Sequence, residues 1–586
     1  MLYFLAMMTT SRRRTPRLAW LFRPYYHLKY WFFRAERRER MRGGLRSGFV
    51  GVQIDGLSHA YFQLALERGY LPNIARHLRR GHIVRDYLSG LPSTTPAAQA
   101  AIFYGIETGI PAFRWFEKAT GRLISCNDLD NVQYFREKVV GDQSGVLDDG
   151  SSYCNLLDGG AKRSVFTVSS PHPQTLFGRF GGLRLLVLLC LHPLRVLRMN
   201  LAVMAEYVAE YFDQRRARTK KRRPVKTGLF PLIRIICNVI LRELQTFGVI
   251  ADIYSGVPRI YTTYSGYDEL AHQYGPASRT ALINLRYTDK RIGEIMRMLR
   301  FCPGADYQLI LLSDHGQTPG YPFEARFGAT LGDAISGFLQ ENKEAVVSAG
   351  PLDFARAKFS YLHEEIEARP DSWRRRLYHR VKNTLQQRIT ALVPETLKVD
   401  AIGGVVVTYS SSLAHLYITG DEKRLTLAQI KRQQPLLLRF LSHHKGIGFL
   451  MARGSGARVW FVHRGGELCS DGKELPVPEQ IAFLQPYGDV TKIFDQLCEF
   501  ARDSSCGDLI IFGALDDGLI TCFDDQIGGH GSVGGEQSHP FLILPTDHPL
   551  AQRSNLAGHA FLYHEVFLPR FQAGEKSVKD SDKRTL

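Results

Sequence analysis

Three hydrophobic segments, each followed at once by residues that can bind a metal ion, constrain the fold of this chain more than any other feature of its sequence. "GFVGVQI" ends at Asp55, "YTTYSGY" ends at Asp268, and "LILLS" ends at Asp314 and His315. Short apolar runs bounded by polar corners are typical of buried strands. The carboxyl ends of parallel strands share one edge of a sheet, so we expect these side chains to meet there.

Helical patterns alternate with these strands. "LPNIARHLRRG" and "TPAAQAAIFYG" each end in glycine, and "TALINLRYTDKRIGEIMRMLR" precedes the third strand. The sequence therefore predicts an α/β fold with a mainly parallel central sheet. Apolar segments at 403–420 and 507–514 are expected to return to that sheet. With 586 residues, 44% of them hydrophobic, the chain is long enough to bury a large core.

Four segments depart from the α/β pattern and define the expected domain organisation. A basic, aromatic arm occupies residues 1–46, and an α/β catalytic domain is expected over 47–572. That domain contains a helical insertion at about 150–250 and a second insertion at about 325–400. The polar tail at 573–586 is expected to be disordered.

The formal net charge of +18 is concentrated in patches such as "RRARTKKRRPVK". Such patches favour a polyanionic neighbour, for which we expect an anionic membrane surface, with nucleic acid as the alternative. Solvated loops and helix faces would also explain them. The apolar run at 183–199 is interrupted by Arg184, His192, Pro193 and Arg195, so it indicates an amphipathic or buried helix pair.

Cysteine usage and the N-terminal pattern predict a cytoplasmic protein that contacts the inner face of the membrane peripherally. The nine cysteines include no CxxC pair, which favours a reducing compartment. "MLYFLAMMTTSRRR" places its apolar residues before its charges, the reverse of a secretory signal.

Two further motifs extend the expected metal site. "DELAH" places Asp268 and His272 on one face of a helix, and the glycine-rich "IGGHGSVGGE" contains His530. Mixed Asp and His ligands suit zinc, or manganese as the alternative, better than magnesium or calcium. Three carboxylates and three imidazoles exceed the needs of one tetrahedral ion and suit two ions about 3.5 to 4 Å apart.

A nucleophile is available in "LPSTTPAAQAAIFYG". This pattern predicts Thr95 at the N-cap of a helix and Pro96 at its first position. There the hydroxyl would lie at the positive end of the helix dipole, beside N–H groups that can hold a phosphate oxygen. An ordinary helix cap is the alternative explanation for a Thr-Pro pair.

The order of Asp55, "PSTTP", "DELAH", "SDHGQT" and "GGHG" resembles the alkaline phosphatase superfamily, nearest its type I phosphodiesterase/nucleotide pyrophosphatase branch. The resemblance covers about 48–140, 255–320 and 400–560. It implies an α/β sandwich with a site for two metal ions. By position, one ion would be held by Asp55, Thr95, Asp314 and His315, and the other by Asp268, His272 and His530.

The chain departs from this branch at two places. Pro96 has no N–H to offer a phosphate, so the Ala97 N–H is expected to replace it. "GIPAFRWF" contains no Asn where related diesterases hold the phosphate. Arg114 is the candidate substitute, and the alternative is that Arg114 is an ordinary surface arginine. A sulfatase would need an arginine that "STTPAAQ" lacks. His415 and His539 are expected to support the metal ligands without binding the metal, or to have structural roles.

The sequence therefore predicts a metal-dependent hydrolase of phosphate esters, most simply a phosphodiesterase in which Thr95 attacks phosphorus in line and water then releases the phosphothreonine. A phosphomonoesterase or a phospho-group transferase of the same superfamily is the alternative. An alternative of another class is a non-catalytic protein with a decayed site that binds membranes or nucleic acid. The sequence leaves the leaving group open among lipid, nucleotide and glycan.

Overall fold

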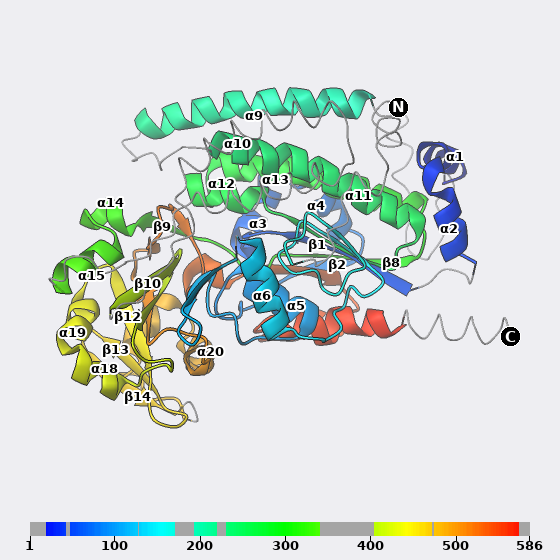
Figure 1. The fold of residues 1–586 in the computed structure, drawn as a ribbon. Helices are drawn as coiled ribbons and strands as arrows, with labels where there is room; N and C mark the ends of the chain where they lie inside the picture. Colours follow the sequence, from blue (N-terminus) through cyan, green and yellow to red (C-terminus); the bar gives the residue numbers. More distant parts are fainter. Residues whose placement is uncertain are drawn as a thin grey trace, which may run out of the picture.

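Two β-sheets organise the chain in the computed structural model, which describes residues 19–42, 47–126, 128–169, 193–219, 230–339, 404–471 and 474–573. A seven-stranded sheet forms the centre of the larger part, and a six-stranded sheet forms a smaller lobe beside it (Figure 1). Each sheet has its own hydrophobic core.

The central sheet is mainly parallel, as the sequence predicts. Its strand order is β2-β19-β8-β1-β7-β5-β6. β1 pairs in parallel with β7 and β8, and β5 pairs in parallel with β6 and β7, whereas β19 lies antiparallel between β2 and β8. The strands are β1 (Ser47–Ile54), β2 (His82–Asp86), β5 (Ser151–Tyr153), β6 (Arg163–Val165), β7 (Arg259–Tyr264), β8 (Asp306–Leu312) and β19 (Phe541–Pro545).

Helices cover both faces of this sheet, which gives a three-layer sandwich (Figure 1). On one side lie α11 (Arg242–Ser255), α12 (Gly266–Tyr274) and α13 (Arg279–Phe301). The other side carries α5 (Thr95–Tyr104), α6 (Leu129–Val139) and the C-terminal helical segment that includes η6 (Leu562–Phe567). Two short helices, α3 (His59–Glu67) and α4 (Pro72–Leu78), follow β1.

The six-stranded sheet is antiparallel, with the order β10-β11-β15-β12-β13-β14. Its strands are β10 (Val405–Ser410), β11 (Leu413–Ile418), β12 (Ile447–Arg453), β13 (Val459–His463), β14 (Gly466–Ser470) and β15 (Leu509–Gly513), and its helices are α18 (Leu427–Gln433), α19 (Pro435–His443) and α20 (Val490–Arg502). The expectation that 403–420 and 507–514 return to the central sheet is therefore wrong. Their apolar runs form strands as predicted, but an apolar run does not specify which sheet a strand joins.

Small strands connect the two parts. β9 (Thr318–Pro322) follows β8 and pairs with β17 (Leu519–Cys522) and β18 (Gly528–Gly529), and β17 also pairs with β16 (Leu515–Asp516). A separate hairpin of β3 (Arg114–Glu117) and β4 (Arg122–Ser125) packs against β10. This arrangement brings the loop after β18 next to the end of β8.

The segments outside the α/β pattern are partly described. The arm contains α1 (Ala19–Lys29), η1 (Trp31–Phe33) and α2 (Arg34–Arg40), and the first insertion contains α9 (Pro193–Thr219), α10 (Phe230–Ile235) and η2 (Ile236–Leu241). The short strands β5 and β6 lie where the sequence suggested only helix, because three-residue strands carry almost no periodic signal. The second insertion begins with α14 (Phe323–Phe327) and α15 (Leu331–Leu339); residues 340–403 and 574–586 lie outside the described residues.

Within the ranges that the structure describes, every helix is too short or too polar to cross a membrane.

Candidate active site

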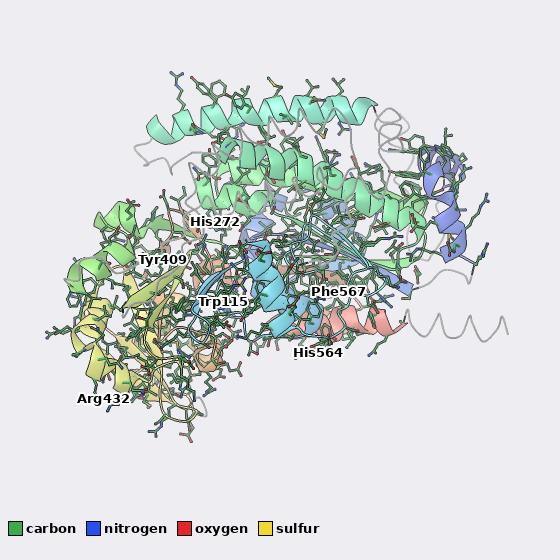
Figure 2. The ribbon with its side chains drawn as sticks, in the orientation of Figure 1. Trp115, His272, Tyr409, Arg432, His564 and Phe567 are labelled. Atoms are coloured by element: carbon green, nitrogen blue, oxygen red, sulfur yellow. The ribbon has the colours of Figure 1, made fainter. Side chains whose placement is uncertain are left out.

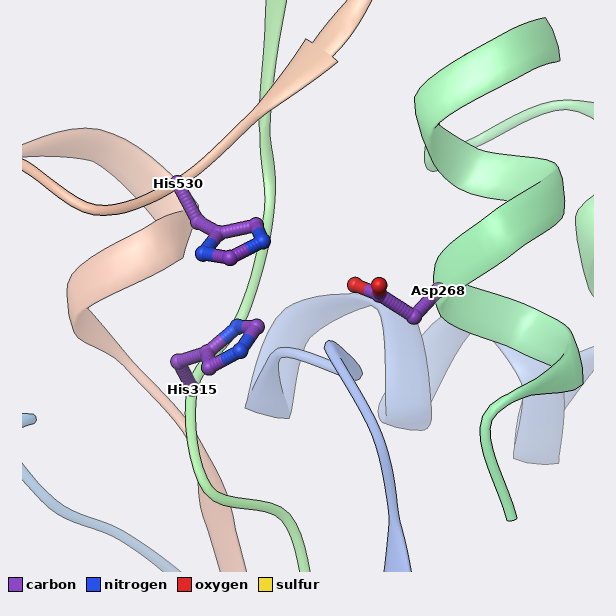
Figure 3. Close-up of side chains that lie close together, drawn as sticks. All are labelled: Asp268, His315 and His530. Atoms are coloured by element: carbon purple, nitrogen blue, oxygen red, sulfur yellow. The ribbon is translucent and has the colours of Figure 1, made fainter. Parts of the chain in front are cut away.

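Residues from four distant segments converge at the carboxyl edge of the central sheet. Asp55 follows β1, Asp314 and His315 follow β8, and Asp268 lies in the first turn of α12, which begins directly after β7. The loop after β18 adds His530, whose ring stacks on His315 with centroids 3.9 Å apart. Figure 3 shows Asp268, His315 and His530 pointing toward one another from three different elements.

Two groups of buried side chains bring their ligand atoms within 4.8 Å of one another. One group is Asp268, His315 and His530, and the other is Asp55, Asp314 and His315. His315 therefore lies within reach of both groups, whereas the resemblance assigns it to one ion. Thr95 and His272, the latter labelled in Figure 2, adjoin these groups. The structure thus brings together all seven predicted ligands: Asp55, Thr95, Asp268, His272, Asp314, His315 and His530.

Each histidine of the cluster directs its Nε2 atom inward. The Nδ1 atom of His272 lies 2.8 Å from the Gly528 carbonyl oxygen. The Nδ1 atom of His530 lies 2.8 Å from the Ser93 carbonyl oxygen, and that of His315 lies 3.0 Å from the Gly316 carbonyl oxygen. A carbonyl oxygen can only accept, so each Nδ1 carries the proton and donates it. This is the outer-shell arrangement by which proteins orient a histidine that binds a metal through Nε2.

The arrangement of these atoms fits a cation. His272 Nε2 and His530 Nε2 are 3.2 Å apart, a separation at which two bare lone pairs would repel. Asp314 Oδ2 is completely buried and has no hydrogen-bond partner among the described residues, which is costly for a carboxylate. A divalent ion would satisfy both, and the mixture of carboxylate oxygens and imidazole nitrogens suits zinc or manganese.

The electrostatics of the protein alone show how tightly these groups interact. Burial would raise the pKa of Asp268, but His272, His530 and His315 hold it well below its usual range. Burial would lower the pKa of His272, but Asp268, whose Oδ2 is 3.2 Å from Nε2, raises it to about 9. Burial, followed by the charge of His315, lowers the pKa of His530 well below its usual value. A proton on His272 thus balances Asp268, and binding of a cation would displace that proton.

Thr95 is the first residue of α5, so the prediction that it is the N-cap is wrong by one position. The N-cap is Thr94, whose side chain makes no capping bond, and Pro96 follows Thr95 within the first turn. The Thr95 hydroxyl lies 3.3 Å from Asp55 Oδ1, to which it donates, and 3.2 Å from His315 Nε2. It therefore faces the ligand cluster instead of capping the helix.

The two predicted substrate contacts lie in different settings. Ala97 is in the first turn of α5, where a backbone N–H has no acceptor within the helix. Arg114 is buried on β3, and its Nη1 lies 3.4 Å from both oxygens of Asp524 and 3.1 Å from the Tyr409 carbonyl. Its charge is thus matched by a carboxylate, and its role in binding phosphate stays a prediction.

Several residues that shape the site escaped the sequence analysis. Gln317 donates to the carbonyl oxygen and to Oδ1 of Asp268 and so fixes that carboxylate. Gly56 has φ of +68°, and a Cβ there would lie 2.1 Å from Asp268 Oδ1, so only glycine fits. The only signals in the sequence are their positions, since Gly56 directly follows Asp55 and Gln317 belongs to "SDHGQT".

The smaller lobe also contributes, through the tip of the hairpin between β10 and β11. Ser411 Oγ accepts from the His530 N–H at 3.2 Å, and the N–H and Oγ of Ser412 both contact the His530 carbonyl, at 3.1 and 2.9 Å. These bonds hold the backbone of His530 in place. No pattern in "TYSSSLAH" indicates that role.

His415 and His539 make their contacts outside the ligand cluster. His415 is fully buried on β11, where its Nε2 contacts the Pro111 carbonyl at 3.1 Å and its Nδ1 accepts from the Gly507 N–H. The His539 side chain is exposed, and its carbonyl accepts from the His59 N–H.

A comparison with known protein families agrees with two of the motifs, "DELAH" and "SDHGQT". The sequence profile of the family "Type I phosphodiesterase / nucleotide pyrophosphatase" matches residues 192–418, which include Asp268, His272, Asp314 and His315. A search of curated protein sequences finds no match.

Two solved structures are similar to this chain over most of its length. Phosphonoacetate hydrolase from Sinorhizobium meliloti 1021, in complex with phosphonoformate, is 14% identical over 90% of this chain and 96% of its own, with a TM-score of 0.43. Murine ectonucleotide pyrophosphatase/phosphodiesterase 5, in complex with AMP, is 11% identical over 90% of this chain and 95% of its own, with a TM-score of 0.45.

The family match confirms the resemblance read from the motifs. The matched region contains four of the seven residues of the ligand cluster, Asp268, His272, Asp314 and His315. The fold brings the other three, Asp55, Thr95 and His530, next to them. Proteins of this family are metal-dependent and act on phosphate esters. Residues 192–418 are thus similar to the type I phosphodiesterase/nucleotide pyrophosphatase family, and this likeness points to a hydrolase of phosphate esters.

Proposed function

We propose that the protein is a two-metal phosphodiesterase in which Thr95 is the nucleophile. The observation that carries this proposal is the position of the Thr95 hydroxyl. It lies 3.2 to 3.3 Å from two members of a buried cluster of carboxylates and imidazoles, Asp55 and His315. Thr95 is also partly exposed, as are Ala97 and His272, so a substrate can approach the cluster from their side.

The residues that would hold the ions are the seven of the ligand cluster, whose three Nε2 atoms point inward. Two divalent ions, when bound there, would stabilise the negative charge that develops on the attacking and leaving oxygens. Zinc is the proposed metal and manganese the alternative.

The chain's own groups prepare the attack. Asp55 Oδ1 accepts a hydrogen bond from the Thr95 hydroxyl and so directs a lone pair of Oγ1 away from the carboxylate. The first turn of α5, including the Ala97 N–H, offers donors and the positive end of the helix dipole to a non-bridging phosphate oxygen. As the bond between Oγ1 and phosphorus forms, the bond from phosphorus to the leaving alcohol breaks, and the alcohol departs with that electron pair and a proton. Water then cleaves the phosphothreonine, which releases a monoester and restores the hydroxyl.

The test is metal content and activity measured on the same samples. The purified protein is depleted with a chelator and titrated with Zn²⁺ or Mn²⁺ while hydrolysis of bis(p-nitrophenyl) phosphate is followed. We expect activity to rise in proportion to bound metal and to saturate near two ions per chain. His530→Ala should lose metal, whereas His539→Ala, whose side chain is exposed nine residues further along, should keep it. Full activity in metal-free protein would refute the proposal.

A further inference from the structure

The long helix α9 presents an apolar stripe to solvent. Figure 1 shows α9 running along one side of the molecule, above α10 and α13. The exposed members of the stripe recur at alternating steps of four and three residues, which places them on one helix face. They are Leu197, Leu201, Met204, Val208 and Tyr211, with Tyr207 and Phe212 beside them, and their exposed fractions lie between 46% and 62%.

Contacts on the opposite face fix the orientation of this stripe. Arg234 of α10 is buried and contacts Glu206 at 2.6 Å, Glu210 at 2.7 Å and Asp213 at 2.9 Å. The Tyr274 hydroxyl adds a hydrogen bond to Glu210 at 2.8 Å. Rolling α9 to bury its apolar residues would break this cluster and leave the buried Arg234 unpaired, at a cost of several kcal/mol. The apolar face therefore stays outward.

This arrangement makes the exposed charge of α9 positive. Glu206, Glu210 and Asp213 are the only acidic residues of α9, and all three are turned toward Arg234. Arg198 and Arg215, in contrast, are exposed.

More cations lie beside the first turns of α9, on α13. Arg286, Tyr287 and Lys290 are exposed there. Burial and then the charges of Arg286 and Arg198 lower the pKa of Lys290, which places these cations close together. The apolar stripe thus has a positively charged border.

The breadth of the stripe decides between two occupants. A second helix packed at this heptad spacing would need charged residues flanking a narrow seam. Here the flanking positions include Tyr207 and Phe212, so the apolar face is broad and rich in aromatic residues. Aromatic and aliphatic side chains bordered by arginine and lysine are typical of a helix that lies in the interface of a bilayer.

The arm supplies a second element of the same kind. On α1 and directly after it, Tyr25, Leu28 and Trp31 are exposed, with fractions of 55%, 71% and 49%. Figure 1 places α1 at the same upper side of the molecule as α9.

We propose that the outer face of α9, bordered by Arg198, Arg215, Arg286 and Lys290, docks the protein on an anionic phospholipid surface. The apolar residues insert to about 5 to 10 Å, at the boundary between headgroups and acyl chains, and the basic border contacts lipid phosphates. This proposal is independent of the hydrolytic mechanism.

The test is flotation of the full-length protein with vesicles of phosphatidylcholine alone or with about 30% phosphatidylglycerol. We expect binding only to the anionic vesicles, and we expect it to weaken strongly between about 0.05 M and about 0.5 M salt because exposed charges are screened. Leu201→Ser combined with Met204→Ser should weaken binding at least about tenfold, because two inserted side chains are lost. The matched control combines Leu436→Ser with Val477→Ser, on the smaller lobe, and should bind as wild type. These two residues are about as exposed as Leu201 and Met204.

Both variants should keep wild-type melting temperature and hydrolysis of a soluble ester, since the replaced residues are exposed and lie outside the ligand cluster. Sedimentation velocity is measured on the same proteins. Failure of the wild type to bind anionic vesicles would overturn the proposal, as would unchanged binding by the α9 variant. If the wild type instead forms a dimer that the α9 variant lacks and ignores vesicles, the face is an interface between two copies and the proposal is wrong.

Discussion

Replacing Thr95 with alanine should separate catalysis from folding. The lost hydroxyl makes contacts with Asp55 and His315 at 3.2 to 3.3 Å, and a hydrogen bond to a charged group contributes about 1.5 to 3 kcal/mol. Spread over the unfolding entropy of a 586-residue chain, about 1.2 kcal/mol per kelvin, this lowers the melting temperature by only about 1 to 3 °C. Loss of the nucleophile should lower kcat/KM about 10³-fold or more, which corresponds to about 4 kcal/mol of transition-state stabilisation.

The assay measures kcat/KM for bis(p-nitrophenyl) phosphate, bound metal and melting temperature on wild type, Thr95→Ala and Thr95→Ser. Thr95→Ser keeps a hydroxyl and should stay within about tenfold of wild type. After acid quenching, a phosphorylated peptide containing residue 95 should be found in wild type and not in Thr95→Ala. Activity of Thr95→Ala above about 10% of wild type, with normal metal content, would refute the nucleophile assignment.

The adjacent residues differ in value as controls. Thr94 Oγ1 is buried without a hydrogen-bond partner among the described residues, so Thr94→Val should retain both fold and activity. Ser93 is a poorer control. Its hydroxyl donates to the Ser532 carbonyl and accepts from the Gly531 N–H, and Ser93→Ala would therefore loosen the loop that carries His530.

Three other outcomes are expected. Chelation should lower the melting temperature, because an ion present at 100 times its Kd stabilises the folded state by about 2.7 kcal/mol per site. An unchanged melting temperature would show that metal binding does not stabilise the folded state. The kcat/KM for bis(p-nitrophenyl) phosphate should exceed that for p-nitrophenyl phosphate, since a dianionic monoester needs a further cation and Arg114 is already paired with Asp524. A preference for the monoester that reverses in Arg114→Ala would contradict this prediction and show that Arg114 is the further cation. Burial lowers the pKa of His415 to about 3, so below its unfolded pKa of about 6.5 the unfolded chain takes up a proton that the folded chain refuses, and stability falls as the pH drops toward 3. Urea unfolding at about pH 7 and about pH 4.5 should therefore show a loss about 2 to 3 kcal/mol smaller in His415→Gln than in wild type, and equal losses would contradict this assignment.

The sequence predicts the central sheet and the ligands at its edge because both depend on local patterns. A buried strand followed by a polar corner is visible for β1, β7 and β8, and the parallel arrangement then determines that Asp55, Asp268 and Asp314 meet. The spacing of Asp268 and His272 depends only on the helical repeat.

Pairing between distant strands is not visible in such patterns. The segments of β10, β11 and β15 are recognisable as strands, but their membership of a second sheet depends on contacts between residues about 100 positions apart. The same holds for Ser411 and Ser412, which act on His530 only because the smaller lobe packs against the loop after β18. The direction of a side chain is equally hidden, so the sequence predicts Thr95 as the helix cap although its hydroxyl faces Asp55.

The position of β19 has a consequence for how the protein is made. This strand, residues 541–545, lies between β2 and β8, so the central sheet stays divided until residue 545 has left the ribosome. Translation from the end of β8 at 312 to the start of β19 at 541 covers 229 residues, which takes roughly 10 to 50 s at about 5 to 20 residues per second. During that interval β8 has an open edge to which other chains can pair. Nascent chains stalled before residue 541 are expected to be cut by protease within β2 and β8, whereas the completed protein resists cleavage there.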